Sequence, residues 1–260
     1  MCLLIFAHRA DPRYPLVLAG NRDEFHDRLT AAARFWPDKP GLLAGRDLEQ
    51  GGTWMGITRG GRFAAITNYR DPSRTAPAPR SRGELPLNYL VGTQEPGEYL
   101  QGLLPVAEAY AGFNLLVGVV GELWYLTNSL PAGERAPLCL QPGIYGLSNA
   151  RLDTPWPKVT RGKGRLETLL RAGTPDHAGL ARVVGDRQLA DSTDLSRQGL
   201  DGDMDRILSA QFITTARYGT RSSTTLWVEN GGLTHWRESS FNPAGEPVEQ
   251  HEESFVITGD

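Results

Sequence analysis

The sequence predicts an α+β protein in which antiparallel sheets pack with helices. Short apolar runs rich in β-branched and aromatic residues recur along the chain, bounded by Gly, Asn, Asp and Pro, which is typical of strands. These runs come in adjacent pairs at the start, middle and end of the chain, with helical patterns between the pairs. That order favours antiparallel sheets over alternating βαβ units.

The apolar runs define ten predicted strands. They span residues 2–8, 16–22, 53–58, 62–69, 113–120, 123–128, 211–217, 223–229, 233–238 and 253–258. At 260 residues the chain could form one large domain or two joined halves, and we favour a single domain over residues 1–260.

Three helices are predicted between the strand pairs. The first follows Ser81, because Ser81 and Glu84 have the spacing of a capping box. The second covers residues 96–110, and the third covers residues 157–171 and could extend toward Val184.

Two polar segments, residues 70–83 and 185–206, lack periodicity and are predicted to be long surface loops. A functional lid is the alternative for the first of them, which carries three prolines and four arginines.

The composition of the chain argues against nucleic acid as a partner and indicates its cellular location. With 30 acidic and 27 basic residues the chain has no positive field for nucleic acid. Its two cysteines, Cys2 and Cys139, are too few for a disulfide framework, which favours a reducing, cytoplasmic location. The apolar run over residues 2–7 is far too short to span a membrane and lacks the features of a signal peptide.

Cys2 follows the initiator methionine at the head of the first predicted strand. Methionine before a small residue is usually trimmed, and Cys2 would then carry an α-amine of pKa about 7.7–8.0 beside a thiol of pKa about 8.5. One residue would hold both base and nucleophile, as in an N-terminal nucleophile enzyme. On position alone, a buried strand residue is the commoner interpretation.

The turn signal at residues 11–15 predicts that the first two apolar runs form an antiparallel hairpin. Paired positions should then sum to 24 or 25, which places Cys2 opposite Arg22 or Asp23. A guanidinium there would stabilise a thiolate, and a carboxylate could hold the α-ammonium. A polar strand end with exposed ion pairs is the alternative.

The start of the chain resembles the NRDE family, the transport and Golgi organisation protein 2 group, in having Met1-Cys2, an apolar strand and then Asn21-Arg22-Asp23-Glu24. Further matching segments are residues 51–56, 67–70, 146–149, 153–158 and 218–221. The resemblance implies a relationship to N-terminal nucleophile hydrolases of the choloylglycine hydrolase and penicillin V acylase type. It also implies their four-layer α-β-β-α sandwich.

The resemblance implies roles for particular residues. Cys2 matches the nucleophile, and Asp23 matches the carboxylate that positions its amine. Asn68 and Asn149 resemble the two asparagines that line the hydrolase site, one as an oxyanion donor, which suits an amide because it donates without titrating. Arg221 resembles a late arginine that could neutralise the nucleophile or a substrate carboxylate, with an ion pair at a strand start as the alternative.

Arg22 departs from the pattern of the hydrolases, in which the arginine precedes the aspartate by several residues. Adjacent Arg22 and Asp23 should point to opposite strand faces, so one of them could face away from the site. Trp54, Tyr69 and Trp156 are the candidate substrate-binding residues, and for the two tryptophans a place in the core is the alternative.

Other motifs are incomplete. Residues 146–150 lack the second glycine of a serine-hydrolase elbow, and residues 201–212 lack the turn glycine and terminal glutamate of a calcium loop. The five histidines have no metal-ligand spacing. We therefore expect no metal site and no required cofactor.

These observations favour a cytoplasmic hydrolase or acyltransferase that acts on a non-peptide amide through Cys2. The rival is a binding or trafficking protein on the same scaffold, since the resemblance also implies links to haem and lipid. Haem binding lost on substitution of Cys or His would support this carrier. The last-ranked hypothesis is a protein anchored in a membrane through an acyl group on Cys2. One acyl chain without a polybasic patch gives no stable membrane anchor.

Overall fold

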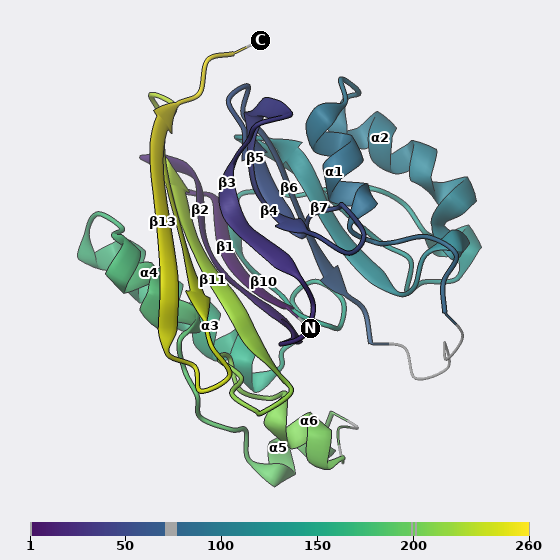
Figure 1. Cartoon of the computed structure of the whole chain (residues 1–260), viewed down its shortest axis with the longest axis vertical. Helices are drawn as coiled ribbons and strands as arrows, with labels where there is room; N and C mark the ends of the chain where they lie inside the picture. Colours follow the sequence, from purple (N-terminus) through teal and green to yellow (C-terminus); the bar gives the residue numbers. More distant parts are fainter. Residues whose placement is uncertain (1, 71–76, 199, 201, 260) are drawn as a thin grey trace.

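Two antiparallel sheets lie face to face in the computed structural model, which describes residues 2–70, 77–198, 200 and 202–259 (Figure 1). The first sheet has the strand order β10 (Gly143–Leu147), β1 (Cys2–Asp11), β2 (Tyr14–Phe25), β11 (Tyr218–Val228), β12 (Leu233–Phe241), β13 (Pro247–Val256). The second has the order β3 (Thr30–Trp36), β4 (Lys39–Asp47), β5 (Met55–Thr58), β6 (Arg62–Asn68), β7 (Phe113–Val119), β8 (Glu122–Thr127), β9 (Leu138–Cys139).

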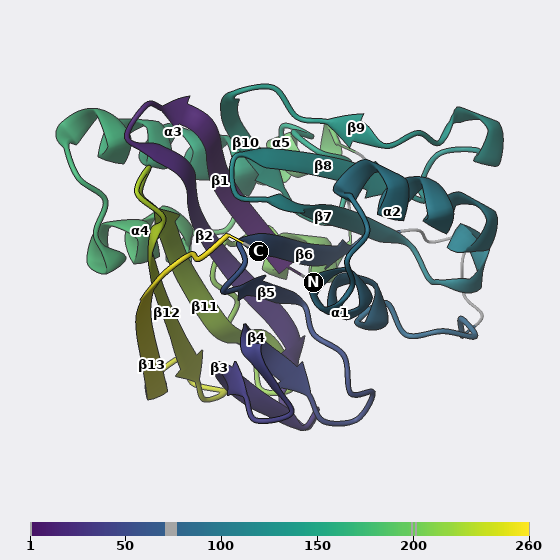
Figure 2. The ribbon, with the colours of Figure 1, turned by 90° about the horizontal axis from the view of Figure 1, so that it is seen from above.

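Helices cover the outer face of each sheet (Figure 2). α3 (Pro157–Ala172) and α4 (His177–Val184) pack on the first sheet, and α1 (Glu84–Val91) and α2 (Pro96–Leu103) pack on the second. Short helices complete the described chain: η1 (Leu104–Ala109), η2 (Ala132–Glu134), α5 (Ser192–Ser196) and α6 (Asp203–Ile207). The α+β class and the four-layer α-β-β-α arrangement expected from the sequence are therefore confirmed.

The apolar strands β1 and β2 are buried on both faces, because one face meets the opposite sheet and the other meets α3 and α4. Leu4 and Phe6 lie in the core between the sheets, whereas Leu3 and Ile5 lie in the core beneath the helices. Successive strand residues point to opposite faces of a sheet. Because both faces are buried here, every residue from 3 to 7 is apolar. Full burial of each such side chain stabilises the fold by about 1.5–3 kcal/mol.

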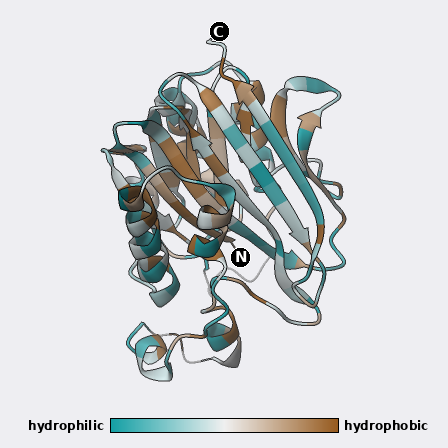
Figure 3. Ribbon diagram, turned by 90° about the vertical axis from the view of Figure 1, so that its left-hand side faces the viewer, coloured by the Kyte–Doolittle hydropathy of each residue, from teal (hydrophilic) through white to brown (hydrophobic). Residues whose placement is uncertain are grey.

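The edge strand β13 is different in character. Its sequence is largely hydrophilic, as Figure 3 shows, and most of its side chains are exposed. Charged side chains on an edge strand oppose pairing with another chain. Only Phe255 is buried along this strand, where its ring lies 5.4 Å from that of Phe35.

The predicted hairpin register is confirmed, because Cys2 pairs with Arg22 and the pairs down to His8 and Leu16 sum to 24. Strands β3 and β4 were not predicted. The first is alanine-rich and the second holds a proline and two glycines, so neither has the β-branched pattern of a strand. Their pairing also shifts register twice, which interrupts the expected alternation.

Three further predictions were wrong in detail. Residues 211–217 are not a strand, because Gln211 is fully buried and its backbone and side chain bond to Asp186 and Lys158 instead of a neighbouring strand. The first helix begins at Glu84 with Gly83 as its cap, so Ser81 does not cap it. The loop predicted over 185–206 contains α5 and α6.

The loop predicted over residues 70–83 is irregular from residue 77 to 83, and residues 71–76 of it lie outside the described chain. Across the described residues, no helix combines the length and the apolar character that a membrane span needs.

His177 gives the fold a testable dependence on pH. Its ring is 7% exposed, with Nδ1 2.6 Å from Thr225 Oγ1 and the ring centroid 4.6 Å from that of Trp227. Burial lowers the pKa of His177 from 6.5 to about 4. Between these values the unfolded chain binds a proton that the folded chain does not, so acidification destabilises the fold by about 1–3 kcal/mol. We expect His177→Gln to lack this loss in urea unfolding at pH 7 and at about pH 4.5; equal losses in both proteins would contradict it.

Candidate active site

Cys2 begins β1, which lies between β10 and β2 in the first sheet, and opens into a cavity of about 770 Å³. In Figure 1 the start of β1 lies at the lower end of the first sheet, near the mark for the N-terminus. The cavity walls come from the ends of β2 and β6, from the β4–β5 connection, from residues 78–83 and from the chain around α6. Tertiary folding therefore brings these parts of the chain, together with Ala111 and Tyr218, to one thiol.

The cavity lining is rich in charge. Its described residues include four arginines and three carboxylates, an excess of one positive charge. These charged residues are Arg22, Arg28, Arg80, Arg82, Asp23, Glu24 and Asp47.

The environment of Cys2 keeps its thiol protonated. Burial raises the pKa of the Cys2 thiol, and the charge of Asp23 raises it further, against a lowering by Arg22 and by the backbone N–H of Asp23. Ser148 Oγ donates a hydrogen bond to the Cys2 carbonyl at 3.0 Å, which fixes the backbone of the residue. A protonated thiol reacts slowly, so a reaction at this sulfur needs a base.

Arg22 lies on the same face of the sheet as its partner Cys2, toward the interior of the sandwich. Its guanidinium is 4.3 Å from the ring of Trp54, and its Nη2 is 3.8 Å from Glu24. The side chain is 6% exposed. Arg22 is thus a buried cation in the cavity wall that favours the thiolate form of Cys2.

Asp23 points to the opposite face of β2, as expected from its adjacency to Arg22, but both side chains line the cavity because β2 ends there. Asp23 is 2% exposed and its Oδ1 accepts a hydrogen bond from Thr220 Oγ1 at 2.7 Å. Burial raises the pKa of Asp23, and the neighbouring Lys158 ammonium acts in the other direction. The sequence left open that Arg22 or Asp23 faces away from the site, but both line the cavity.

Lys158 is a buried cation for which no role was predicted from the sequence. It is the last residue of segment 153–158, one of the segments that resemble the NRDE family. It is 2% exposed, and its Nζ donates to the Leu208 carbonyl at 2.8 Å and lies 5.6 Å from the Trp156 ring. Burial lowers its pKa to about 8, while the charges of Asp23 and Cys2 raise it. The lysine thus supports a negative charge at Asp23 from beneath the site.

The two asparagines serve different purposes. Asn68 ends β6 in the cavity wall, and its side-chain amide makes no hydrogen bond to any of the described residues. Asn149 is 1% exposed, and its amide donates to the Asn68 carbonyl at 2.7 Å. Asn68 is therefore the donor available to a ligand, and Asn149 braces it.

Arg221 is not among the cavity-lining residues. It is the extra residue of a β-bulge, because Thr220 pairs with Asp23 and Ser222 pairs with Arg22. Its Nη1 donates to the carbonyls of Phe25 and Arg28 at 2.8 and 3.1 Å, which holds the turn after β2. The structure thus separates Arg221 from the group formed by Cys2, Arg22, Asp23 and Asn68.

The candidate substrate-binding residues are also divided. Trp54 lines the cavity and stacks on Arg22. Tyr69 lies outside the lining, with its backbone N–H bonded to Gly112, and Trp156 lines a separate small cavity of about 20 Å³ beside Lys158. Only Trp54 of the three is placed to contact a ligand near Cys2.

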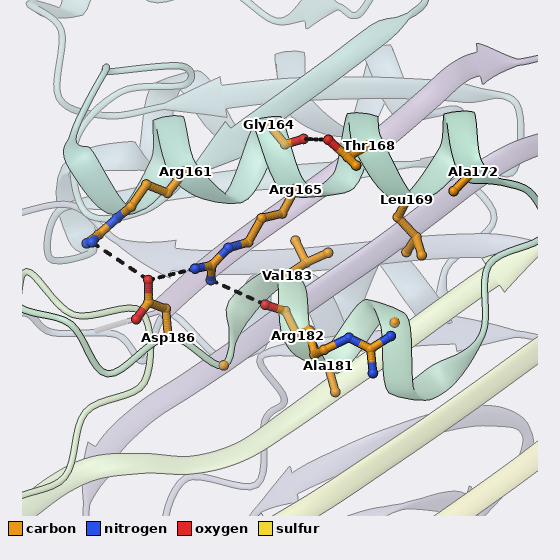
Figure 4. Close-up of a pocket in the computed structure, with 12 residues that line it drawn as sticks. Arg161, Gly164, Arg165, Thr168, Leu169, Ala172, Ala181, Arg182, Val183 and Asp186 are labelled. Atoms are coloured by element: carbon orange, nitrogen blue, oxygen red, sulfur yellow. Dashed lines mark hydrogen bonds and ion pairs between the residues drawn. The ribbon is translucent and has the colours of Figure 1, made fainter.

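A second large hollow, of about 1030 Å³, lies between α3 and α4 (Figure 4). Two of its three arginines are engaged by one carboxylate: Arg165 binds Asp186 at 2.9 Å, and Arg161 lies 3.7 Å from the same group. None of the predicted site residues lines it. The cavity at Cys2 is therefore the candidate active site.

Comparison with known proteins gives a family match over most of the chain. The family model described as Transport and Golgi organisation 2 matches residues 1–243. The Transport and Golgi organization protein 2 homolog of Bos taurus is 36% identical over 264 residues, covering 92% of this chain and 93% of that protein. The corresponding homolog of Homo sapiens is 34% identical over 262 residues with the same coverage.

Solved structures give a more distant likeness. A mutant of the conjugated bile acid hydrolase from Clostridium perfringens is 10% identical with a TM-score of 0.46, covering 99% of this chain and 92% of that one. The Caenorhabditis elegans ortholog of N-acylethanolamine-hydrolyzing acid amidase is 10% identical with a TM-score of 0.40, covering 86% and 92%.

Proposed function

The chain belongs to the Transport and Golgi organisation 2 family, and from this premise we propose that it is a hydrolase or acyltransferase that cleaves a non-peptide amide through an acyl-enzyme on Cys2. The observation that carries the proposal is the placement of Cys2 at the head of β1, in a cavity shared with Asp23 and Asn68. This arrangement supplies a nucleophile, a carboxylate for its amine and an amide donor for an oxyanion.

The proposed reaction begins once Met1 has been removed and the α-amine of Cys2 is free. The amine takes the thiol proton while Sγ attacks the substrate carbonyl carbon, so that a C–S bond forms and an electron pair moves to the carbonyl oxygen. Asn68 donates to that oxyanion. Collapse breaks the C–N bond, and the ammonium returns its proton to the leaving amine.

A thioester on Cys2 then remains. Attack by water gives the carboxylic acid and restores the thiol, which is hydrolysis; attack by a second amine gives a new amide, which is acyl transfer. The reaction needs no cofactor in this scheme. Asp23, held by Thr220, orients the α-amine throughout.

Intact mass spectrometry of the native-sequence protein tests the proposal. We expect loss of Met1 and, after exposure to a panel of N-acyl amines and N-acyl amino acids, either an acyl adduct on the chain or release of the free acid. Retention of Met1 on every molecule would remove the free-amine mechanism.

A carrier on the same scaffold is the second candidate, supported by the word transport in the names of the relatives and by the size of the cavity. In that case the cavity holds cargo such as a lipid or haem, and Cys2 would be a soft ligand for haem iron. Titration with haem separates the two functions, because saturable binding that is lost in Cys2→Ala, without amide cleavage by the native chain, would favour the carrier.

A further inference from the structure

Arg82 is a cavity-lining arginine that no sequence motif singled out. It lies just before α1, and its backbone is fixed on both sides: the Gly83 carbonyl accepts from Thr53 N–H at 3.0 Å, and the Arg82 carbonyl accepts from Leu85 N–H at 3.0 Å. Gly52 packs directly on this segment, since a Cβ there would lie 2.4 Å from the Gly83 carbonyl carbon. The position of Arg82 in the wall is therefore rigidly defined.

The charge of Arg82 is not matched by a protein carboxylate. Its Nη1 donates to the Gly112 carbonyl at 2.9 Å, and within the described parts of the chain no carboxylate lies within 4.0 Å of it. The other three lining arginines each have an acidic neighbour. Arg22 lies near Glu24, Arg28 binds Asp47 and Glu49, and Arg80 binds Glu84.

Arg82 also lies within electrostatic reach of the reacting sulfur. Burial lowers the pKa of the guanidinium, and the charge of Cys2 is the largest of the effects that oppose this. Glu24 also acts on Arg82, but without contact. A half-buried guanidinium with no carboxylate in contact is costly, and an anionic ligand that enters the cavity removes the cost. The site therefore attracts negative charge close to Cys2.

We propose that Arg82 receives a carboxylate of the substrate, so that the substrates of this site are N-acyl compounds with a single negative charge. This inference rests on the proposed function for the nature of the reaction. A single charge fits because Arg82 alone of the described lining arginines has no carboxylate within 4.0 Å, and because Asp23, Glu24 and Asp47 oppose a multiply charged group. The planar fork of the guanidinium matches the two oxygens of a carboxylate.

A test that needs no turnover compares two alkylating reagents at Cys2, anionic iodoacetate and neutral iodoacetamide. Rates are followed by peptide mass, with Cys139 in β9 as an internal reference thiol. We expect the ratio of iodoacetate rate to iodoacetamide rate to be about ten times higher at Cys2 than at Cys139, which corresponds to about 1.4 kcal/mol. Arg82→Gln should abolish this excess, and Arg82→Lys should keep most of it.

Arg62→Gln is the matched control, because Arg62 is another half-buried arginine that donates to carbonyls, those of Tyr89 and Gln94, away from the cavity. Its ratio should equal that of the unmodified chain. An unchanged ratio in Arg82→Gln would overturn the role of Arg82 and leave the proposed amide chemistry untouched. A Cys2 that reacts with neither reagent would count against both, since the proposed chemistry needs an accessible Cys2 thiol.

The substrate consequence is measured separately. An N-acylglycine should react faster than the matching N-acylglycinamide, and Arg82→Gln should lose that preference. Failure of both compounds to react would count against the proposed function, whereas equal reaction of both with the unmodified chain would count against Arg82 as the carboxylate receptor.

Discussion

Replacing Cys2 by alanine is expected to lower amide cleavage by at least about 10³-fold and to abolish the acyl adduct. The reason lies in the lining of the cavity. Three other described residues there carry a hydroxyl, Thr53, Ser81 and Tyr218. Thr53 Oγ1 donates to the Met55 carbonyl at 3.1 Å. Burial raises the pKa of Tyr218, and its hydroxyl donates to the Asp23 carbonyl at 2.8 Å, so it stays protonated. Ser81 is flanked by Arg80 and Arg82, which cannot act as bases.

Two variants make this measurement decisive. Cys2→Ser keeps a nucleophile at the same place but with a less acidic proton, so it should retain a small part of the activity and accumulate an ester. Cys139→Ser is the matched control, since Cys139 lies in β9 at the edge of the second sheet and does not line the cavity. Cleavage that persists in Cys2→Ala and disappears in another variant would place the nucleophile elsewhere.

The part of the site that sequence could predict is the part held by local pairing. The turn over residues 11–15 fixes the register of β1 and β2, and from that register Cys2 lies opposite Arg22 with Asp23 beside it. Hairpin registers follow from turn position and the alternation of side chains, which are both visible in the chain. The same reasoning correctly placed Arg22 and Asp23 on opposite faces.

The rest depends on contacts between distant segments. Arg82 lines the cavity because the backbone of Gly52 and Thr53 packs against Gly83. Sequence periodicity cannot predict such a contact between distant segments. Arg221 leaves the lining because a bulge adds one residue to β11, and a bulge carries no fixed sequence signature. Lys158 is buried through the fold of α3 over the first sheet.

Strand prediction failed for a related physical reason. β3 and β4 are held by pairing with their neighbours, so alanine and glycine are tolerated where propensity favours larger β-branched residues. Conversely, the apolar residues 212 and 213 are buried without a strand, because Gln211 anchors the segment to the helices. The apolar pattern of this segment therefore indicated burial and not strand pairing.

Replacing Asp23 by asparagine is expected to change two properties of Cys2 in opposite directions. Acylation by amide substrates should fall about 100-fold or more, because the carboxylate no longer orients the α-amine that acts as base. Alkylation by iodoacetamide near neutral pH should become faster, because the charge of Asp23 raises the pKa of the Cys2 thiol and its removal increases the thiolate fraction.

This divergence separates a positioning role of Asp23 from a merely structural one. A structural defect at β2 would slow both reactions or neither. Asp186→Asn is the control, because Asp186 binds Arg165 and Arg161 beside α3 and α4 and does not line the cavity, so both rates should stay unchanged.

Lys158→Met extends the argument to the cation beneath Asp23. Loss of the ammonium leaves the Leu208 carbonyl unpaired and should cost about 2–3 kcal/mol of stability. Since the charge of Lys158 favours the ionised form of Asp23, acylation should fall in this variant too, and the double variant with Asp23→Asn should be little slower than Asp23→Asn alone. Additive losses would mean that the two residues act independently on Cys2.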